Sequence, residues 1–314
     1  MAEWPETNIS TARISGLHSK GFLSVAEAAS TGFPNNRRRP SPRPDQVVSL
    51  AAYHERGLGL PAHHFFRGLL YYYKIELHHL APGGILHVAA FITLCEAFLG
   101  IPPHFDLWKY FFHARGGSST KDGQPLPLIG GVVLQLRSGR GGQYLRLPLA
   151  TSNKGWHREW FHIRNSEPPL PAFTGAAPVH QESWGWGLTG NERAKVEVIL
   201  TQVADLVREG LTGEVVLRTF FARRIQPIRA RPHGMWLYLG PTDPSRTSEE
   251  QLTESEIAAR VRCVLDVGSL GDAGPHPTPL RSGMPSTRVS SLFACLSSLD
   301  RLRLFFTFFS SALF

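Results

Sequence analysis

The pattern of apolar and polar residues predicts that the first half of the chain is helical. Apolar residues recur at helical spacing in residues 63–77, 83–100 and 104–115, and short breaks containing glycine or proline separate these segments. In residues 83–100 the apolar positions cover most of the helical circumference, which predicts a helix buried on nearly every side. We expect this helix to form the centre of the hydrophobic core.

The first 45 residues are predicted to form an N-terminal segment of their own. A short helix between Asn8 and Gly21 would bury Ile14 and Leu17, which share one face. The next segment, residues 34–45, holds four prolines and four arginines in twelve positions, a composition typical of an extended, solvated connector. Its basic run is also compatible with a nuclear-import or phosphate-binding signal, so both interpretations stay open.

After residue 128 the pattern changes to short segments in which apolar and polar residues alternate between glycine-rich turns. This alternation is typical of half-buried strands. We therefore expect one small antiparallel sheet between Ile129 and Asn165, built from residues 130–138, 140–149 and 156–165, in which the first two segments pair as a hairpin. The turn between them contains a single Arg-Gly-Gly run. This run resembles one RNA-binding RGG element, although a glycine hairpin turn is the simpler explanation.

Two further helices are predicted in the last third of the folded chain. The first begins near Thr189 or Asn191. Its apolar residues form one seam, which consists of Val196, Ile199, Val203, Leu206 and Gly210. We expect this seam to pack in a hairpin against residues 215–224, although a coiled coil shows the same pattern. The second helix is expected to begin at a capping signature formed by Ser248 and Gln251. Its apolar stripe consists of Leu252, Ile257, Val261 and Leu265.

Together these patterns predict an α+β protein that is mostly α-helical. It has a helical N-terminal half, a small antiparallel β-sheet, a helical C-terminal third and a C-terminal tail that is disordered or unevolved as structure. The predicted divisions of the chain are residues 1–45, 46–187, 188–268 and 269–314. The last division is first rich in Gly, Pro and Ser and then in Phe, and it matches nothing upstream.

Composition favours a polyanionic partner. The chain has 33 Lys and Arg residues against 25 Asp and Glu residues, and its formal net charge is +8. RNA or DNA is therefore the expected partner, and self-association is the second. Three widely spaced cysteines and an N-terminus without a signal-like apolar run indicate a cytoplasmic or nuclear protein that is not secreted. We expect no membrane partner and no small-molecule ligand.

The motifs of several enzyme classes are missing. Two-metal strand transfer needs about three carboxylates around ions roughly 4 Å apart, and no aspartate lies inside an apolar strand-like segment. Asp-Thr-Gly, Asp-Ser-Gly, Asp-Asp, phosphate-loop and Gly-x-Ser-x-Gly motifs are all absent. The three cysteines, at positions 95, 263 and 295, are too far apart in sequence to build a compact Cys3His zinc knuckle. These absences argue against a polymerase, an aspartic protease, a nucleotide hydrolase and a serine esterase, and we expect no catalytic residues.

Histidine is frequent, but its spacing does not predict a metal site. His157, Glu159 and His162 come closest to a metal motif. A separation of five residues places the two histidines on opposite faces of a strand, so they cannot share an ion there. The adjacent pairs at 63–64 and 78–79 are expected to be helix-end or packing residues. We therefore predict no metal ion and no cofactor.

The best candidate for nucleic-acid binding lies between Glu214 and Asp243, where arginines occur without acidic residues and are followed by aromatic residues. Arginine binds phosphates, and aromatic rings stack on unpaired bases. The candidate residues are Arg218, Arg223, Arg224, Arg229, Arg231, Trp236 and Tyr238. The alternative is that these arginines cover the apolar helix and pair with the acidic residues of the segment 249–256.

Several long phrases resemble the plant family called "putative gypsy-type transposon". They are HERGLGLP (54–61), FFRGLLYYY (65–73), ELHHLAP (76–82), ILHVAAFITLCEAFLGI (85–101) and PHFDLW (103–108). Later phrases, such as PLATSNKGWHREWFHIRN (148–165), extend the resemblance over residues 4–267. Residues after 267 depart from the family pattern.

The resemblance implies a product or remnant of a plant long-terminal-repeat retrotransposon. It supplies no catalytic residues, because the transposase label of the family describes origin and not an active site. In such elements the first product is gag-like, assembles and packages RNA. We therefore expect a non-enzymatic assembly or RNA-associated protein. Two alternatives stay open, namely an enzyme of transposition or nucleic-acid processing, and a decayed copy without function.

Overall fold

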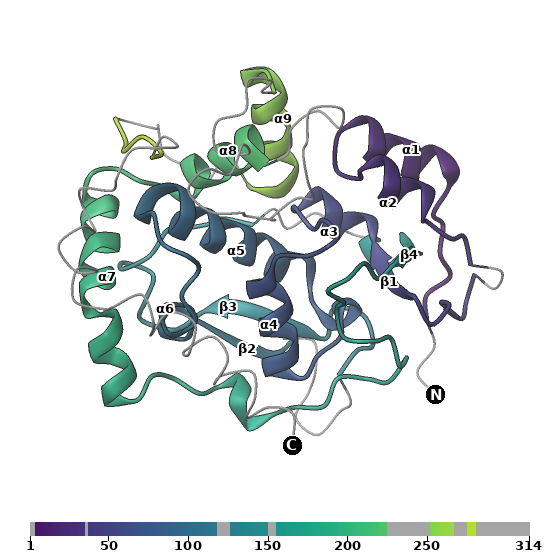
Figure 1. Ribbon diagram of the computed structural model, residues 1–314, viewed down its shortest axis with the longest axis horizontal. Helices are drawn as coiled ribbons and strands as arrows, with labels where there is room; N and C mark the ends of the chain where they lie inside the picture. Colours follow the sequence, from purple (N-terminus) through teal and green to yellow (C-terminus); the bar gives the residue numbers. More distant parts are fainter. Residues whose placement is uncertain are drawn as a thin grey trace.

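In a computed structural model, the part of the chain that the structure describes comprises residues 4–34, 37–117, 126–149, 155–224, 252–266 and 275–280. These residues form α-helices, short helical turns and two small antiparallel sheets (Figure 1). The helices are α1 (Thr11–Ser19), α2 (Val25–Ala29), α3 (Ala51–Glu55), α4 (His64–Tyr73), α5 (Pro82–Thr93), α6 (Phe105–Phe111), α7 (Gly190–Arg208), α8 (Gly213–Arg224) and α9 (Glu254–Val264). The strands are β1 (Gln46–Leu50), β2 (Phe112–Gly116), β3 (Val132–Leu136) and β4 (Trp160–Arg164). The predicted α+β, mainly helical class is confirmed.

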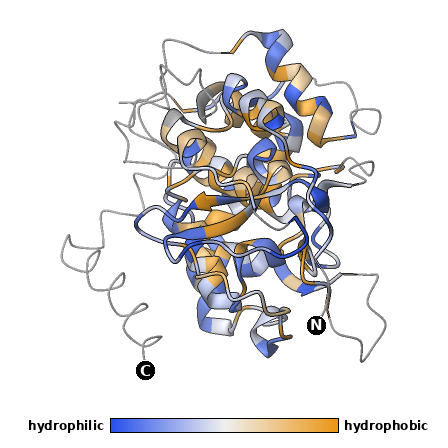
Figure 2. Cartoon of the chain, turned by 90° about the vertical axis from the view of Figure 1, so that its right-hand side faces the viewer, coloured by the Kyte–Doolittle hydropathy of each residue, from blue (hydrophilic) through white to orange (hydrophobic). Residues whose placement is uncertain are grey.

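The centre of the core is the helical run formed by α5 and a π-helical turn, η2 (Leu94–Leu99). It packs against α8 on one side and β3 on another (Figure 1). All six residues of η2 and most residues of α5 are buried, and hydrophobic colour gathers in the middle of the molecule in Figure 2. Gly100, with a φ of 69°, ends the run. The predicted central helix is thus confirmed.

This central run is also the helix whose length and composition would suit a membrane span. The window Pro82–Leu99 has the required apolar character, and 89% of it is buried inside the fold. Core packing therefore accounts for its apolar composition.

The N-terminal segment packs on β4. The predicted short helix is α1, with Ser10 as its N-cap and with Ile14 and Leu17 buried. Before this helix, the Thr7 hydroxyl donates to the Trp160 carbonyl at 2.7 Å. The Trp160 indole in turn donates to the Pro5 carbonyl at 2.9 Å. These bonds connect residues before α1 to a strand far along the chain.

The prediction of a single sheet is wrong, because the described residues form two sheets. β1 pairs with β4 between Gln46↔Arg164 and Leu50↔Trp160, and β2 pairs with β3 between Phe112↔Leu136 and Gly116↔Val132. The expected hairpin between residues 130–138 and 140–149 does not form, because β3 pairs with β2 instead. Residues 112–116 form β2, although the pattern predicted a helix over residues 104–115. The prediction failed because the periodicity of a short apolar run does not distinguish a helix from a strand.

The packing of the C-terminal helices also differs from expectation. α7 packs against α6, whereas α8 packs against α5 and α9, so the predicted α7–α8 hairpin is not the main contact. The N-cap of α7 is Thr189, as predicted. The N-cap of α9 is Thr253, which forms a capping box with Glu256. The predicted cap at Ser248 and Gln251 is therefore wrong, and those two residues lie outside the described residues.

Part of the predicted tail contacts the core. Residues 275–280 are described, and the Leu280 amide donates to the Ala97 carbonyl at 2.8 Å. Gly210 has a φ of +95°, and a Cβ at this position would lie 2.4 Å from the Pro275 carbonyl oxygen. Both the backbone angle and the close approach therefore require glycine at this corner.

A half-buried histidine on α5, His87, makes the stability of the fold depend on pH. The His87 ring packs against Phe112 at 5.3 Å, and burial lowers the pKa of His87 to about 4. The unfolded chain binds its proton near pH 6.5. The free energy of unfolding should therefore fall as pH decreases from about 6.5 to about 4, by at most about 1.4 kcal/mol per pH unit.

Denaturant unfolding at pH 7 and pH 5 measures this contribution. His87→Leu replaces the titrating imidazole with an apolar side chain of similar size. We expect its stability to change less between the two pH values than that of the natural chain. Equal changes in the two proteins would contradict the assignment to His87.

Candidate nucleic-acid interface

The predicted arginine and aromatic candidates are only partly described. Arg218 lies on α8 and is described in full. Arg223 and Arg224 lie on the last turn of α8, but their side chains are outside the described part of the structure. Arg229, Arg231, Trp236 and Tyr238 lie outside the described residues. The structure therefore does not show whether these residues come together, and their role stays a prediction.

Arg218 is held between two carboxylates. Its Nε donates to Glu214 Oε1 at 2.8 Å, and its Nη1 donates to Glu254 Oε1 at the start of α9. A guanidinium with two carboxylate partners has little charge left for a phosphate. These contacts favour the alternative interpretation for Arg218, in which the arginine joins α8 to α9.

A second basic surface lies on the β2–β3 sheet. Strand side chains alternate between faces, and the inner face of this sheet, with Phe112, Ala114, Val132 and Leu134, is buried. The outer face carries mainly polar side chains, with Val133 opposite Arg115 as an apolar member. We define the ribbon face as the polar side chains of this outer face and the residues that flank it, namely His113, Arg115, Gln135, Arg137, Arg140 and Trp186.

Arg137 is the fixed centre of the ribbon face. Its Nε donates to the carbonyls of Lys109 and Phe112 at 2.8 and 3.1 Å. Its Nη1 and Nη2 donate to the carbonyls of Gly185 and Trp186 at 3.1 and 2.5 Å. Neutral carbonyls orient the guanidinium without cancelling its charge. Arg137 therefore holds a positive charge in one place between β3 and the turn η4 (Glu182–Trp184).

Arg140 is placed by the turn that follows β3. Its guanidinium lies over the Tyr110 ring, 3.9 Å from the ring centroid, and its Nη1 donates to the Tyr110 hydroxyl and to Gln143 Oε1. A cation over an aromatic face is stabilised by the ring electrons. Residues 138–139 form a turn, although it does not join the two strands of the expected hairpin, and this turn presents Arg140.

The charges of the ribbon face act on one another. The pKa of His113 is lowered by burial first and then by the positive charges of Arg137 and Arg115. The pKa of Arg137 is also lowered, mainly by burial and in part by Arg140. His113 is therefore neutral near pH 7, and the three arginines supply the positive charge of the face.

No carboxylate neutralises these arginines within the described residues. Arg115, Arg137 and Arg140 are half-buried and take part in none of the ion pairs there. The surrounding sequence has the same bias, since residues 107–158 contain eight lysines and arginines against one acidic residue, Asp122. This count is the signal that sequence reasoning missed, because the glycine turn was favoured over the RNA-binding interpretation of the same run.

Trp186 adds an aromatic side chain at the edge of the ribbon face. It is 56% exposed, and the bond from Arg137 to its carbonyl holds its backbone beside the arginines. The neighbouring Trp184 is fully buried and donates to the Tyr73 carbonyl at 2.8 Å. The buried tryptophan therefore anchors the segment on which the exposed tryptophan is displayed.

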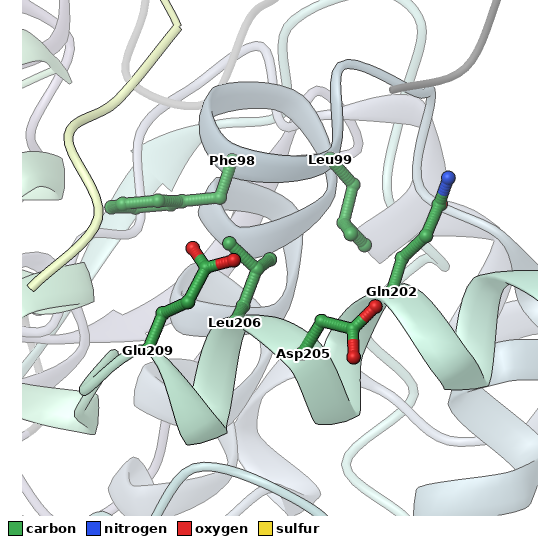
Figure 3. Close-up of a pocket in the computed structure, with 6 residues that line it drawn as sticks. All are labelled: Phe98, Leu99, Gln202, Asp205, Leu206 and Glu209. Carbon is green, nitrogen blue, oxygen red and sulfur yellow. The ribbon is translucent and has the colours of Figure 1, made fainter.

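The pocket between η2 and α7 is a poorer site for a polyanion. Its lining is Phe98, Leu99, Gln202, Asp205, Leu206 and Glu209 (Figure 3). Asp205 and Glu209 place two carboxylates in the lining of this pocket, so a phosphate would be repelled there by like charges.

One group of side chains in the described residues has the spacing of metal ligands. Glu76, His78 and His79 have ligand atoms within 4.8 Å of one another, whereas His157, Glu159 and His162 form no such group. Burial lowers the pKa of both His78 and His79. The adjacent histidines were predicted to be helix-end residues, and they do end the turn η1 (Leu77–His79). Sequence reasoning missed Glu76, whose spacing of three residues from His79 was the available signal.

Comparison with known families places part of this chain in a retrotransposon-related class. Residues 47–116 match the family described as "Putative gypsy type transposon". This segment runs from β1 to the end of β2 and includes Arg115 of the ribbon face. The chain therefore carries a gypsy-type transposon-related domain. Comparison with curated proteins and with solved structures found no match.

Proposed function

We propose that this chain is a non-catalytic, gag-like protein of retrotransposon origin that binds RNA through the ribbon face. The observation that carries the proposal is the cluster of Arg115, Arg137 and Arg140, which has no carboxylate partner in the described residues. The gypsy-type domain and the formal net charge of +8 support it.

The geometry suits a single-stranded ligand. Oriented guanidinium groups bind backbone phosphates, and an exposed indole such as that of Trp186 stacks on a base that is not paired. Neither contact reads a base edge. We therefore propose binding that tolerates different sequences and depends strongly on salt.

Fluorescence anisotropy with a labelled single-stranded RNA tests the proposal on the full chain. Binding should weaken steeply between about 50 and 200 mM salt, with a slope near −0.7 for each phosphate contact. The double substitution Arg115→Gln and Arg140→Gln removes two charges without touching the Arg137 carbonyl bonds. We expect it to reduce the salt slope by about 1 to 1.5.

A matched double substitution controls for net charge. Arg193 and Arg208 on α7 are exposed, and each lies beside a carboxylate of the same helix. Arg193→Gln with Arg208→Gln changes the net charge equally and should leave RNA binding almost unchanged. Equal losses from both double variants would show that the ribbon face has no special role.

Two further measurements separate the parts of the proposal. Trp186→Ala should weaken RNA binding by about 1–3 kcal/mol if the indole stacks on a base. Incubation of the purified chain with nucleic acid and magnesium tests the non-catalytic part. Turnover of the nucleic acid would overturn that part and favour an enzyme of nucleic-acid processing.

A further inference from the structure

A compact group of ligand-type side chains lies at the 3-10 turn η1, away from the ribbon-face residues in sequence. Residues three apart nearly eclipse one another in a 3-10 turn, so Glu76 and His79 lie close together. The His78 ring lies 4.3 Å from the His79 ring, between centroids. The turn therefore brings one carboxylate and two imidazoles to one place.

The distance between Glu76 and His78 matches the spacing of metal ligands better than that of a hydrogen bond. His78 Nδ1 lies 3.5 Å from Glu76 Oε2, which is long for a hydrogen bond. Bonds of about 2.0–2.1 Å to a tetrahedral zinc ion place two ligand atoms roughly 3.4 Å apart. All three ligand atoms lie within 4.8 Å of one another, so small side-chain rotations would complete the geometry.

The charge and polarity of the group also favour a cation. Glu76 is 9% exposed, and no lysine or arginine pairs with it in the described part of the chain. His78 is 1% exposed. A nearly buried carboxylate without a cationic partner is costly, and a bound cation would offset that cost.

The surrounding residues hold the ligand atoms in place. The Thr174 amide and hydroxyl both donate to the Glu76 carboxylate, at 2.9 and 2.5 Å. His79 Nε2 lies 2.9 Å from the Ala176 carbonyl, to which it donates. A metal-binding histidine commonly donates its second ring N–H to such a carbonyl. His79 Nδ1, which accepts the Glu76 amide at 3.0 Å, would exchange that hydrogen bond for the ion.

We propose that Glu76, His78 and His79 bind one divalent transition-metal ion of the zinc class, with water as the fourth ligand. Such an ion would strengthen the connection between η1 and the segment that contains Thr174 and Ala176. The rings of Trp4 and Phe173 pack on the His78 ring, at 5.1 and 5.0 Å between centroids. The ion therefore stabilises the fold at a position that the RNA proposal does not use.

Zinc affinity of the full chain, measured by competition with a chromophoric chelator, tests this proposal. We expect one tight site per chain. His78→Ala should weaken the affinity by at least roughly 100-fold, because even outer partners of metal ligands contribute 10- to 100-fold. His180→Ala, which removes an exposed histidine outside the group, should leave the affinity unchanged. A natural chain that binds zinc no more tightly than His78→Ala overturns the proposal.

A spectroscopic measurement locates the ion independently of affinity. Cobalt(II) in the site should show the visible absorption of a tetrahedral ion and should quench the fluorescence of Trp4. Trp4→Phe should therefore lose part of the cobalt-dependent quenching. Unchanged quenching in Trp4→Phe would place the ion elsewhere and overturn the assignment.

Glu76→Gln supplies a second variant in case His78→Ala fails to fold. It keeps an oxygen acceptor for Thr174 and removes the charge, so the fold should persist while zinc affinity falls. Unchanged zinc affinity in Glu76→Gln would also overturn the proposal.

Discussion

Replacing Trp108 with alanine is expected to lower the free energy of unfolding by about 3–5 kcal/mol. Trp108 is completely buried on α6. Its ring stacks on Phe112 at 4.3 Å and meets Phe91 edge-on at 5.2 Å. Its indole also donates to the Tyr73 hydroxyl at 3.1 Å. The substitution would remove a large apolar side chain, leave a cavity and deprive a buried hydroxyl of its donor.

Denaturant unfolding measures this loss through the midpoint concentration at an unchanged slope. Trp108→Phe is the matched control, because it keeps the ring contacts with Phe112 and Phe91 and removes only the indole N–H and some volume. We expect it to retain most of the stability. A loss below about 1 kcal/mol for Trp108→Ala would show that the centre of the core lies elsewhere.

Replacing Glu96 with alanine is expected to lower the free energy of unfolding by about 1–3 kcal/mol, for a different reason. His63 Nδ1 accepts the Phe65 amide at 3.0 Å, so the proton of the neutral ring is on Nε2. That Nε2 donates to Glu96 Oε1 at 3.0 Å, and both side chains are fully buried. Alanine would remove this acceptor and leave a buried N–H of His63 without it.

Glu96→Gln separates the hydrogen bond from the charge. Its side-chain oxygen can still accept the His63 N–H, so we expect a loss well below that of Glu96→Ala. Unfolding curves of the two variants at pH 7 make the comparison. Equal losses would indicate that the negative charge of Glu96, and not its role as acceptor, stabilises the π-helical turn.

Sequence patterns predicted the helices better than the sheets, because a helix depends on local spacing. The caps at Ser10 and Thr189 and the end at Gly100 follow from side-chain and backbone preferences of a few neighbouring residues. The pairing of β1 with β4 depends instead on residues far apart in the chain. No local pattern within β1 indicates which strand pairs with it. Because the pairing is what makes these residues a strand, the sequence did not predict β1.

The candidate interface shows the same division. The arginines between Glu214 and Asp243 attracted attention because they are adjacent in sequence, yet Arg218 pairs with Glu254 on another helix. The ribbon face draws its residues from β2, β3, a turn and the segment at Trp186. Its positive charge depends on tertiary contacts that place Arg137 among carbonyls. The sequence shows the arginines, but it does not show which carboxylates of the described residues lie near them.

The β1–β4 pairing has a consequence for how the protein is made. During synthesis from the N-terminus, β1 emerges early, but its partner strand ends only at Arg164. Residues 47–116 match the transposon family. Their strand β1 therefore lacks its partner β4 until the ribosome has added nearly fifty more residues after residue 116. The segment that matches the transposon family is thus shorter than the structural unit that includes the β1–β4 pairing.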